Sequence, residues 1–175
     1  MREIYLAGGC YWGVEKYVSL IKGVKETEVG FANGRTENPT YDEVKHQDTG
    51  HAETVKVLYD ESELPLAALL RLFYKIIDPT AVDRQGEDVG HQYRTGVYYT
   101  DEADREVIKK TLAELSEQVG SAVAVECQSL EHFWRAEEYH QKYLDKNPGG
   151  YCHVPLQAMQ WVKSVEPKEF DYGIN

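Results

Sequence analysis

The chain has 175 residues, of which 42% are hydrophobic, and a formal net charge of -11. This length suits a single domain over residues 1–175; the composition excludes a disordered protein, and the acidity excludes nucleic acid as an expected partner. No apolar stretch approaches the roughly 20 residues of a membrane span, and the N-terminus lacks a signal-peptide pattern, so we expect a cytoplasmic protein that binds no membrane.

Hydrophobic periodicity predicts closely spaced elements through residue 99. Their order is strand 3–8, helix 14–21, strand 24–31, strand 54–59, helix 65–77 and strand 95–99. Gly23 is placed to end the first helix and Pro65 to open the second. This β-α-β-β-α-β order is typical of a ferredoxin-like two-layer sandwich, an α+β fold with a mostly antiparallel sheet and helices on one face.

A C-terminal extension follows this core. Apolar residues from Ala103 to Leu115 predict a helix closed by Gly120, residues 122–127 predict a strand, and residues 136–144 predict a short last helix. From about residue 147 the glycine-rich sequence indicates an irregular, mobile tail.

Cys10 lies between the first strand and the first helix, in the run Gly8-Gly9-Cys10-Tyr11-Trp12-Gly13. Glycines allow a tight turn, and the dipole and unpaired amides of a helix N-terminus favour the nucleophilic thiolate. Cys10 is therefore a candidate nucleophile, although a small buried residue in a glycine turn would give the same pattern. Tyr11 and Trp12 either pack in the core or form an apolar wall beside Cys10 that fits a methyl group.

Glu53 has the same strand parity as Val55 and Val57, so it is expected to face the apolar side. Desolvation there would raise the pKa of its carboxyl, and a proton retained near neutral pH makes a general acid. The alternative is a glutamate at the strand end that turns to solvent.

Two tyrosines and two further cysteines complete the candidates. Tyr93, by strand parity, and Tyr41, in an Asn-Pro-Thr-Tyr turn, can each donate a hydrogen bond to a polarised oxygen, although either can be structural. Cys152 lies in the glycine-rich tail, where mobility would let its thiol reach a distant partner. Cys127 has the parity of a buried structural cysteine. No Cys-x-x-Cys pair or histidine spacing indicates a metal site.

Together these segments resemble the A-type peptide methionine sulfoxide reductases over nearly the whole chain. The resemblance rests on five runs in the same order: Gly9-Cys10-Tyr11-Trp12-Gly13; Asn38-Pro39-Thr40-Tyr41; Thr49-Gly50-His51-Ala52-Glu53; Arg84-Gln85-Gly86-Glu87-Asp88 with Gln92-Tyr93-Arg94; and Asn147-Pro148-Gly149-Gly150-Tyr151-Cys152. The family has a ferredoxin-like α+β fold, in agreement with the predicted elements.

The resemblance implies a role for each matching residue around the sulfoxide. Cys10 would attack the sulfoxide sulfur, and Glu53 would protonate the oxygen, to which Tyr41 and Tyr93 would hydrogen-bond. The family acts on the S epimer of methionine sulfoxide, in proteins and peptides and as the free amino acid, which makes it a protein-repair enzyme under oxidative stress.

The remaining implied roles concern substrate binding and regeneration of the Cys10 thiol. Tyr11 and Trp12 would hold the terminal methyl group, and Asp88 would bind substrate near the sulfoxide. Cys10 would leave the first step as a sulfenic acid, Cys152 would condense with it to a disulfide, and thioredoxin, or dithiothreitol in vitro, would reduce that disulfide. No metal or organic cofactor is implied, and a monomer is expected.

Three departures from the family pattern stand out. Tyr11 occupies a position that is usually Phe, residues 31–34 replace the usual Tyr-x-Gly-Gly, and no cysteine follows Cys152. The first two are expected to tune the pocket, and the third implies a single-disulfide cycle unless Cys127 takes part. Two rival functions are a peroxide-reducing thiol enzyme, which would not need an acid like Glu53, and a non-enzymatic acidic module that grips apolar peptide side chains.

Overall fold

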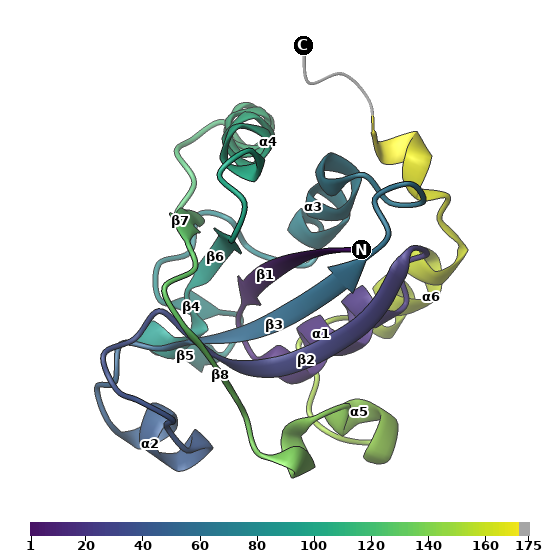
Figure 1. The fold of residues 1–175 in the computed structure, drawn as a ribbon. Helices are drawn as coiled ribbons and strands as arrows, with labels where there is room; N and C mark the ends of the chain where they lie inside the picture. The colour runs from purple at the N-terminus through teal and green to yellow at the C-terminus, as the bar shows by residue number, and fades with distance from the viewer. Residues whose placement is uncertain (172–175) are drawn as a thin grey trace.

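The computed structural model describes residues 1–171 (Figure 1). The strands are β1 (Arg2–Gly8), β2 (Val24–Ala32), β3 (Ala52–Tyr59), β4 (Arg84–Gln85), β5 (Asp88–Val89), β6 (Thr95–Tyr99), β7 (Glu126–Ser129) and β8 (Phe133–Arg135). The α-helices are α1 (Tyr11–Ser19), α2 (Tyr41–His46), α3 (Leu66–Tyr74), α4 (Asp104–Val119), α5 (Tyr143–Lys146) and α6 (Leu156–Ser164). The 3₁₀ helices are η1 (His91–Tyr93), η2 (Glu138–His140) and η3 (Pro167–Phe170).

The main sheet has six strands in the order β7-β6-β1-β3-β2-β8. The pairs β6–β1, β1–β3, β3–β2 and β2–β8 are antiparallel, whereas β6 and β7 are parallel. The α+β class predicted from the sequence is confirmed, with a mixed sheet that is wider than the four strands of the predicted core. The extra strands β7 and β8 lie at the two edges and come from the segment that follows α4.

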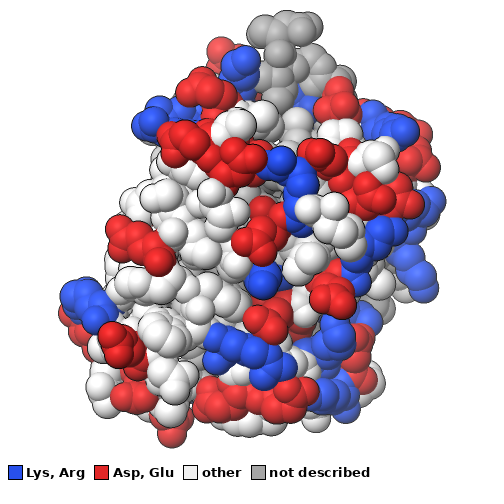
Figure 2. Space-filling model, in the orientation of Figure 1, with Lys and Arg blue, Asp and Glu red and all other residues white. Residues whose placement is uncertain are grey.

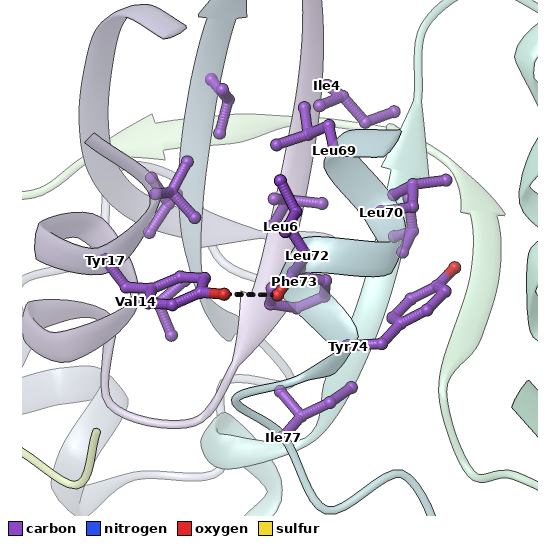
Figure 3. Close-up of a cluster of buried hydrophobic side chains, with 14 of the residues drawn as sticks. Ile4, Leu6, Val14, Tyr17, Leu69, Leu70, Leu72, Phe73, Tyr74 and Ile77 are labelled. Carbon is purple, nitrogen blue, oxygen red and sulfur yellow. Dashed lines mark hydrogen bonds between the residues drawn. The ribbon is translucent and has the colours of Figure 1, made fainter. Parts of the chain in front are cut away.

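The main hydrophobic core lies between one face of the sheet and the helices α1 and α3 (Figure 3). It brings together Ile4 and Leu6 of β1, Val14 and Tyr17 of α1, and Leu69, Leu70, Leu72 and Phe73 of α3. Each such side chain contributes roughly 1.5–3 kcal/mol when fully buried. The hydroxyl of Tyr17 donates to the carbonyl oxygen of Leu72 at 2.8 Å, which ties α1 to α3 and so fixes the helix that starts at the Cys10 loop.

Several C-terminal predictions are wrong in position. The strand expected at 122–127 is β7, which begins only at Glu126, and the helix expected over 136–144 is divided into η2 and α5 by Lys142, whose φ is 52°. The tail expected to be irregular from about 147 contains α6, which buries Met159 and Val162 against the main core. The helix α2 and the strand β8 were not predicted.

The outer edge of β2 is covered along its C-terminal part, residues 29–32. The strand β8 pairs with Gly30, Phe31 and Ala32. Next to it, the amide side chain of Gln141 accepts from the Val29 N–H at 2.8 Å and donates to the Val29 carbonyl at 2.9 Å. Residues 24–28 extend beyond this cover and include Lys25, Glu26 and Glu28, with a β-bulge between Val24 and Glu26.

Charged side chains of both signs are interspersed on the face of the molecule that carries β2 (Figure 2). Within residues 1–171, no helix combines the length and the apolar character needed to cross a membrane.

Candidate active site

Cys10 lies where β1 passes into α1. Gly9 takes a φ of +91°, a conformation that favours glycine, and Cys10 follows as the N-cap residue of α1. Its side chain is 7% exposed, so the thiol is buried at a helix N-terminus. The sequence prediction of this position is confirmed.

Glu53 lies at the start of β3 and faces the core side, as its parity with Val55 predicts. Its side chain is 1% exposed. One carboxyl oxygen, Oε1, accepts from the backbone N–H of Tyr11 at 3.3 Å, while Oε2 is buried without a hydrogen-bond partner among the described residues. Burial raises the pKa of Glu53 to about 8; the Tyr11 hydrogen bond opposes this and the charge of Asp88 adds to it. The carboxyl therefore holds a proton at neutral pH.

The protonation of Cys10 differs from the sequence expectation. Burial, reinforced by the negative charge of Glu53, raises the pKa of the Cys10 thiol well above its ordinary range, and a hydrogen bond from the Trp12 backbone opposes this only in part. Desolvation thus outweighs the helix N-terminus, and without substrate Cys10 is a thiol rather than a thiolate. Protonation of Glu53 removes one of the charges that disfavour ionisation of Cys10.

Tyr41 and Tyr93 approach this pair from two other segments. Tyr41 is the first residue of α2, whose N-cap Thr40 forms a capping box with Glu43. Tyr93 lies in η1, so the strand parity used to orient it does not apply, yet it is 9% exposed. Burial raises the pKa of both phenols, and the charges of Glu53 and Cys10 raise it further. Both hydroxyls keep their protons and can donate hydrogen bonds.

An aromatic cluster borders Cys10. Trp12 stacks on Tyr143 with ring centroids 3.8 Å apart and planes inclined by 11°, and its indole N–H donates to Nδ1 of His140 at 3.0 Å. Tyr11 packs against Phe31 and His140, with centroids 5.7 and 5.6 Å away, and its hydroxyl is buried without a hydrogen-bond partner among residues 1–171. Of the two alternatives that the sequence left open, core packing describes Tyr11, which is a member of the main core, and Trp12 is partly buried against the same core.

Asp88 of β5 ties the C-terminal segment to this region. Its Oδ2 accepts from the hydroxyl of Tyr151 at 2.9 Å. Its negative charge also contributes to the raised pKa values of Cys10 and Glu53. The structure therefore places Asp88 beside the predicted site and in contact with the segment that carries Cys152.

Cys152 is half-buried and lies against the first turn of α1. A methyl group on Gly13 would be 3.1 Å from its Sγ, so the absence of a side chain at Gly13 allows this contact. The thiol donates to the carbonyl oxygen of Val154 at 3.3 Å. Cys127 lies in β7 opposite Val97. It is also half-buried, whereas the sequence predicted a fully buried structural cysteine. All three cysteines are free thiols.

The sequence prediction did not include His140, Tyr143 or His153. His140 and Tyr143 lie within residues 136–144, for which the sequence predicts one short helix, and the break at Lys142 instead directs them to Trp12. Their signal was the concentration of aromatic residues in the segment 139–143. His153 had no signal beyond its place next to Cys152.

The geometry therefore combines a buried thiol, a carboxyl that holds a proton, two phenol donors and a cluster of aromatic rings. A proton donor beside a thiol suits attack on a centre whose oxygen must leave. No group of three or more His, Cys, Asp or Glu residues within 1–171 is arranged to hold a metal ion.

Comparisons with known proteins identify related sequences. The family model described as peptide methionine sulfoxide reductase matches residues 2–169. The peptide methionine sulfoxide reductase MsrA of Lachnoclostridium phytofermentans is 62% identical over 164 residues, which cover 94% of this chain and 99% of that protein.

Solved structures of methionine sulfoxide reductases are also similar to this chain. Mxr1 from Saccharomyces cerevisiae in reduced form has a TM-score of 0.83 and 36% identity, covering 89% of this chain and 91% of that one. Methionine sulfoxide reductase A of Corynebacterium diphtheriae has a TM-score of 0.78 and 35% identity, covering 88% and 82%.

Proposed function

The chain belongs to the peptide methionine sulfoxide reductase family and is an enzyme that reduces methionine sulfoxide, and we propose that Cys10 is its nucleophile and Glu53 its general acid. The substrate is the S epimer of the sulfoxide, in peptides, in proteins and as the free amino acid. The biological role that follows is repair of oxidised proteins.

In the first step a bond forms between Cys10 Sγ and the sulfoxide sulfur while Glu53 gives its proton to the sulfoxide oxygen. The thiol proton passes to the carboxylate, so Glu53 ends the step protonated. The hydroxyl then moves from the substrate sulfur to Sγ of Cys10: the S–O bond to the substrate sulfur and the newly formed S–S bond break, and an S–O bond to Cys10 forms. Methionine leaves and Cys10 is a sulfenic acid, so the substrate sulfur has been reduced by two electrons and the Cys10 sulfur oxidised by two. Tyr41 and Tyr93 donate hydrogen bonds to the oxygen as its negative charge develops.

The observation that carries this proposal is the Glu53 carboxyl. It is buried, its pKa is near 8, and its Oε1 is held by the first turn of the helix that begins at Cys10. Its free Oε2 has no protein partner among residues 1–171, so it is available to the oxygen of a bound sulfoxide. A sulfoxide oxygen leaves poorly unless it is protonated, and Glu53 supplies that proton at neutral pH.

Neighbouring residues bind the substrate and regenerate the Cys10 thiol. Tyr11 and Trp12 contact the terminal methyl group, and Asp88 binds near the sulfoxide end. The Cys152 thiol attacks the Cys10 sulfenic acid, which forms a disulfide and releases water. Thioredoxin then reduces the disulfide, a partnership supported by the solved complex of Saccharomyces cerevisiae Mxr1 with Trx2.

The fold supports the same assignment. The four inner strands run antiparallel in the order β6-β1-β3-β2, with α1 and α3 on one face, which is the arrangement that two split βαβ units produce. We therefore assign the ferredoxin-like two-layer core to these elements. A cytoplasmic monomer is part of the proposal, to be tested by fractionation and light scattering.

One assay tests the proposal against both rival functions. The protein is incubated with dithiothreitol and either epimer of N-acetyl methionine sulfoxide, and methionine release is followed. We expect turnover of the S epimer only, and none in Cys10→Ser, because an alcohol is a far weaker nucleophile at neutral pH. Faster reduction of hydrogen peroxide than of the sulfoxide would favour a peroxidase, and peptide binding that survives alkylation of Cys10 without any turnover would favour a binding module.

A further inference from the structure

His153 is a buried titratable residue that the proposed mechanism leaves without a task. It follows Cys152 in the loop that leads to α6. Both ring nitrogens, Nδ1 and Nε2, are enclosed and neither makes a well-formed hydrogen bond among the described residues, although the backbone of Gly8 lies close enough to interact with the ring. A buried imidazole that is left with at most one weak contact loses hydrogen bonds that water would give it, which is a cost expected to have a compensating use.

The ring of His153 lies between the chain segments that carry the two thiols. A methyl group on Gly9, the residue before Cys10, would be 3.6 Å from Nε2 of His153. A methyl group on Gly13 would be 3.4 Å from Cε1 of the same ring and 3.1 Å from Sγ of Cys152. The two glycines on either side of the Cys10 turn thus leave the space into which His153 and Cys152 fit.

Cys152 needs a base in order to act. Its thiol donates to the Val154 carbonyl oxygen, and burial raises its pKa, so the nucleophilic thiolate is scarce at neutral pH. Attack on a sulfenic acid also requires a proton for the hydroxide that leaves. A neutral imidazole that lies against Gly9, the neighbour of Cys10, and against Gly13, which Cys152 also approaches, can meet both needs with one proton.

We propose that His153 is the acid–base residue of disulfide formation, in a step that rests on the proposed roles of Cys10 and Cys152. One ring nitrogen takes the proton from the Cys152 thiol as that sulfur bonds to Cys10. The S–O bond of the sulfenic acid breaks, and the imidazolium gives the same proton to the leaving hydroxide, which becomes water. The Cys10 sulfur is reduced and the Cys152 sulfur oxidised, so no further reductant is consumed.

The surroundings of His153 favour the neutral ring that this role requires. Burial lowers the pKa of the imidazole below its ordinary value, while the Asp88 carboxylate of β5 and the Gly8 carbonyl of β1 oppose the shift. In its own segment, His153 directly follows the titratable residues Tyr151 and Cys152. The base form is therefore present throughout the neutral range.

The test separates the two chemical steps. Reduced enzyme is mixed with one equivalent of N-acetyl methionine (S)-sulfoxide; methionine release reports the first step, and timed alkylation with N-ethylmaleimide followed by mass spectrometry reports the loss of two thiols. In His153→Gln, disulfide formation should slow by about 10²–10⁴-fold relative to methionine release. Dimedone should trap the accumulated sulfenic acid on Cys10. His46→Gln, which removes an exposed histidine from α2, is the matched control and should behave as wild type.

The pH profile excludes a merely structural role. The wild-type rate of disulfide formation should be level from about pH 6.5 to 8.5, whereas in His153→Gln it should rise about tenfold per pH unit as the Cys152 thiolate forms. A His153→Gln rate within about twofold of wild type, or a wild-type rate that itself rises tenfold per pH unit, would overturn the inference. If wild type releases methionine but forms no Cys10–Cys152 disulfide, the role of His153 fails together with the proposed role of Cys152, while the reductase function stands; if no methionine is released, the proposed function itself fails.

Discussion

Replacing Glu53 with Gln should inactivate the enzyme and stabilise its fold at the same time. The carboxyl keeps its proton up to a pKa of about 8 in the folded protein, against 4.5 for an ordinary glutamate. Between these two values the unfolded chain releases a proton that the folded protein retains, so the stability of the wild type falls as pH rises through this window. At about 1.36 kcal/mol per pH unit, roughly 3 kcal/mol has been lost by pH 7.

Glu53→Gln removes this dependence because an amide does not titrate, and its oxygen can still accept from the Tyr11 N–H. Urea unfolding of both proteins at pH 5, 6, 7 and 8 should show the variant gaining on the wild type by about 1.4 kcal/mol per pH unit, with no further gain above pH 8. Its single-turnover rate should meanwhile fall by about 10²–10⁴-fold.

The pH dependence is the decisive quantity, since a change in packing would shift stability equally at every pH. Glu117→Gln, on an exposed position of α4, serves as control and should track the wild type. A stability difference between Glu53→Gln and wild type that is the same at pH 5 and pH 8 would refute the burial argument for Glu53, whatever the effect on rate.

Further predictions concern the same site. The single-turnover rate of the wild type should be level from pH 6 to 7.5 and fall about tenfold per pH unit above pH 8, where Glu53 loses its proton; a rate that keeps rising there would exclude it as the acid. Cys152→Ser should still release about one methionine per enzyme but lose turnover with thioredoxin, whereas Cys127→Ser should turn over nearly normally; peptide mapping that joins Cys10 to Cys127 would reverse these assignments. Tyr11→Phe should retain activity and gain about 1 kcal/mol in urea unfolding, since the buried hydroxyl has no partner to lose; a clear loss of stability would reveal one.

Local sequence patterns were sufficient to place the two central residues of the candidate site. Strand alternation identified the face on which Glu53 lies, and the glycine turn before an apolar helix placed Cys10 at a helix N-terminus. Both inferences depend only on residues that are close in the sequence: the alternation of apolar residues along a strand for Glu53, and the position before a helix for Cys10. The ionisation of Cys10 was predicted wrongly because burial and the charge of Glu53 arise from tertiary contacts.

The C-terminal third depends more on tertiary contacts and was predicted less well. The apolar spacing from Ala136 to Leu144 suits one helix, yet Lys142 takes a left-handed conformation and its N–H donates to the carboxylate of Glu15 at 2.8 Å. A buried carboxylate from another helix thus ends the pattern. The helix α6 was missed because its apolar residues do not all lie on one face. Leu156 and Trp161 are exposed, and the buried pair Met159 and Val162 is too short a pattern to indicate a helix.

The half-covered edge of β2 has a consequence for the behaviour of the protein at high concentration. An open strand edge offers unpaired amides and carbonyls to the same edge of another molecule, which is a common start of aggregation. Beyond the cover given by β8 and Gln141, a second copy would meet the bulge near Lys25 and the charges of Glu26 and Glu28. The bulge disrupts the hydrogen-bond ladder that a new strand would need, and charged side chains along an open edge disfavour pairing with a second copy. The protein therefore discourages strand addition at the part of the edge that its own chain leaves open.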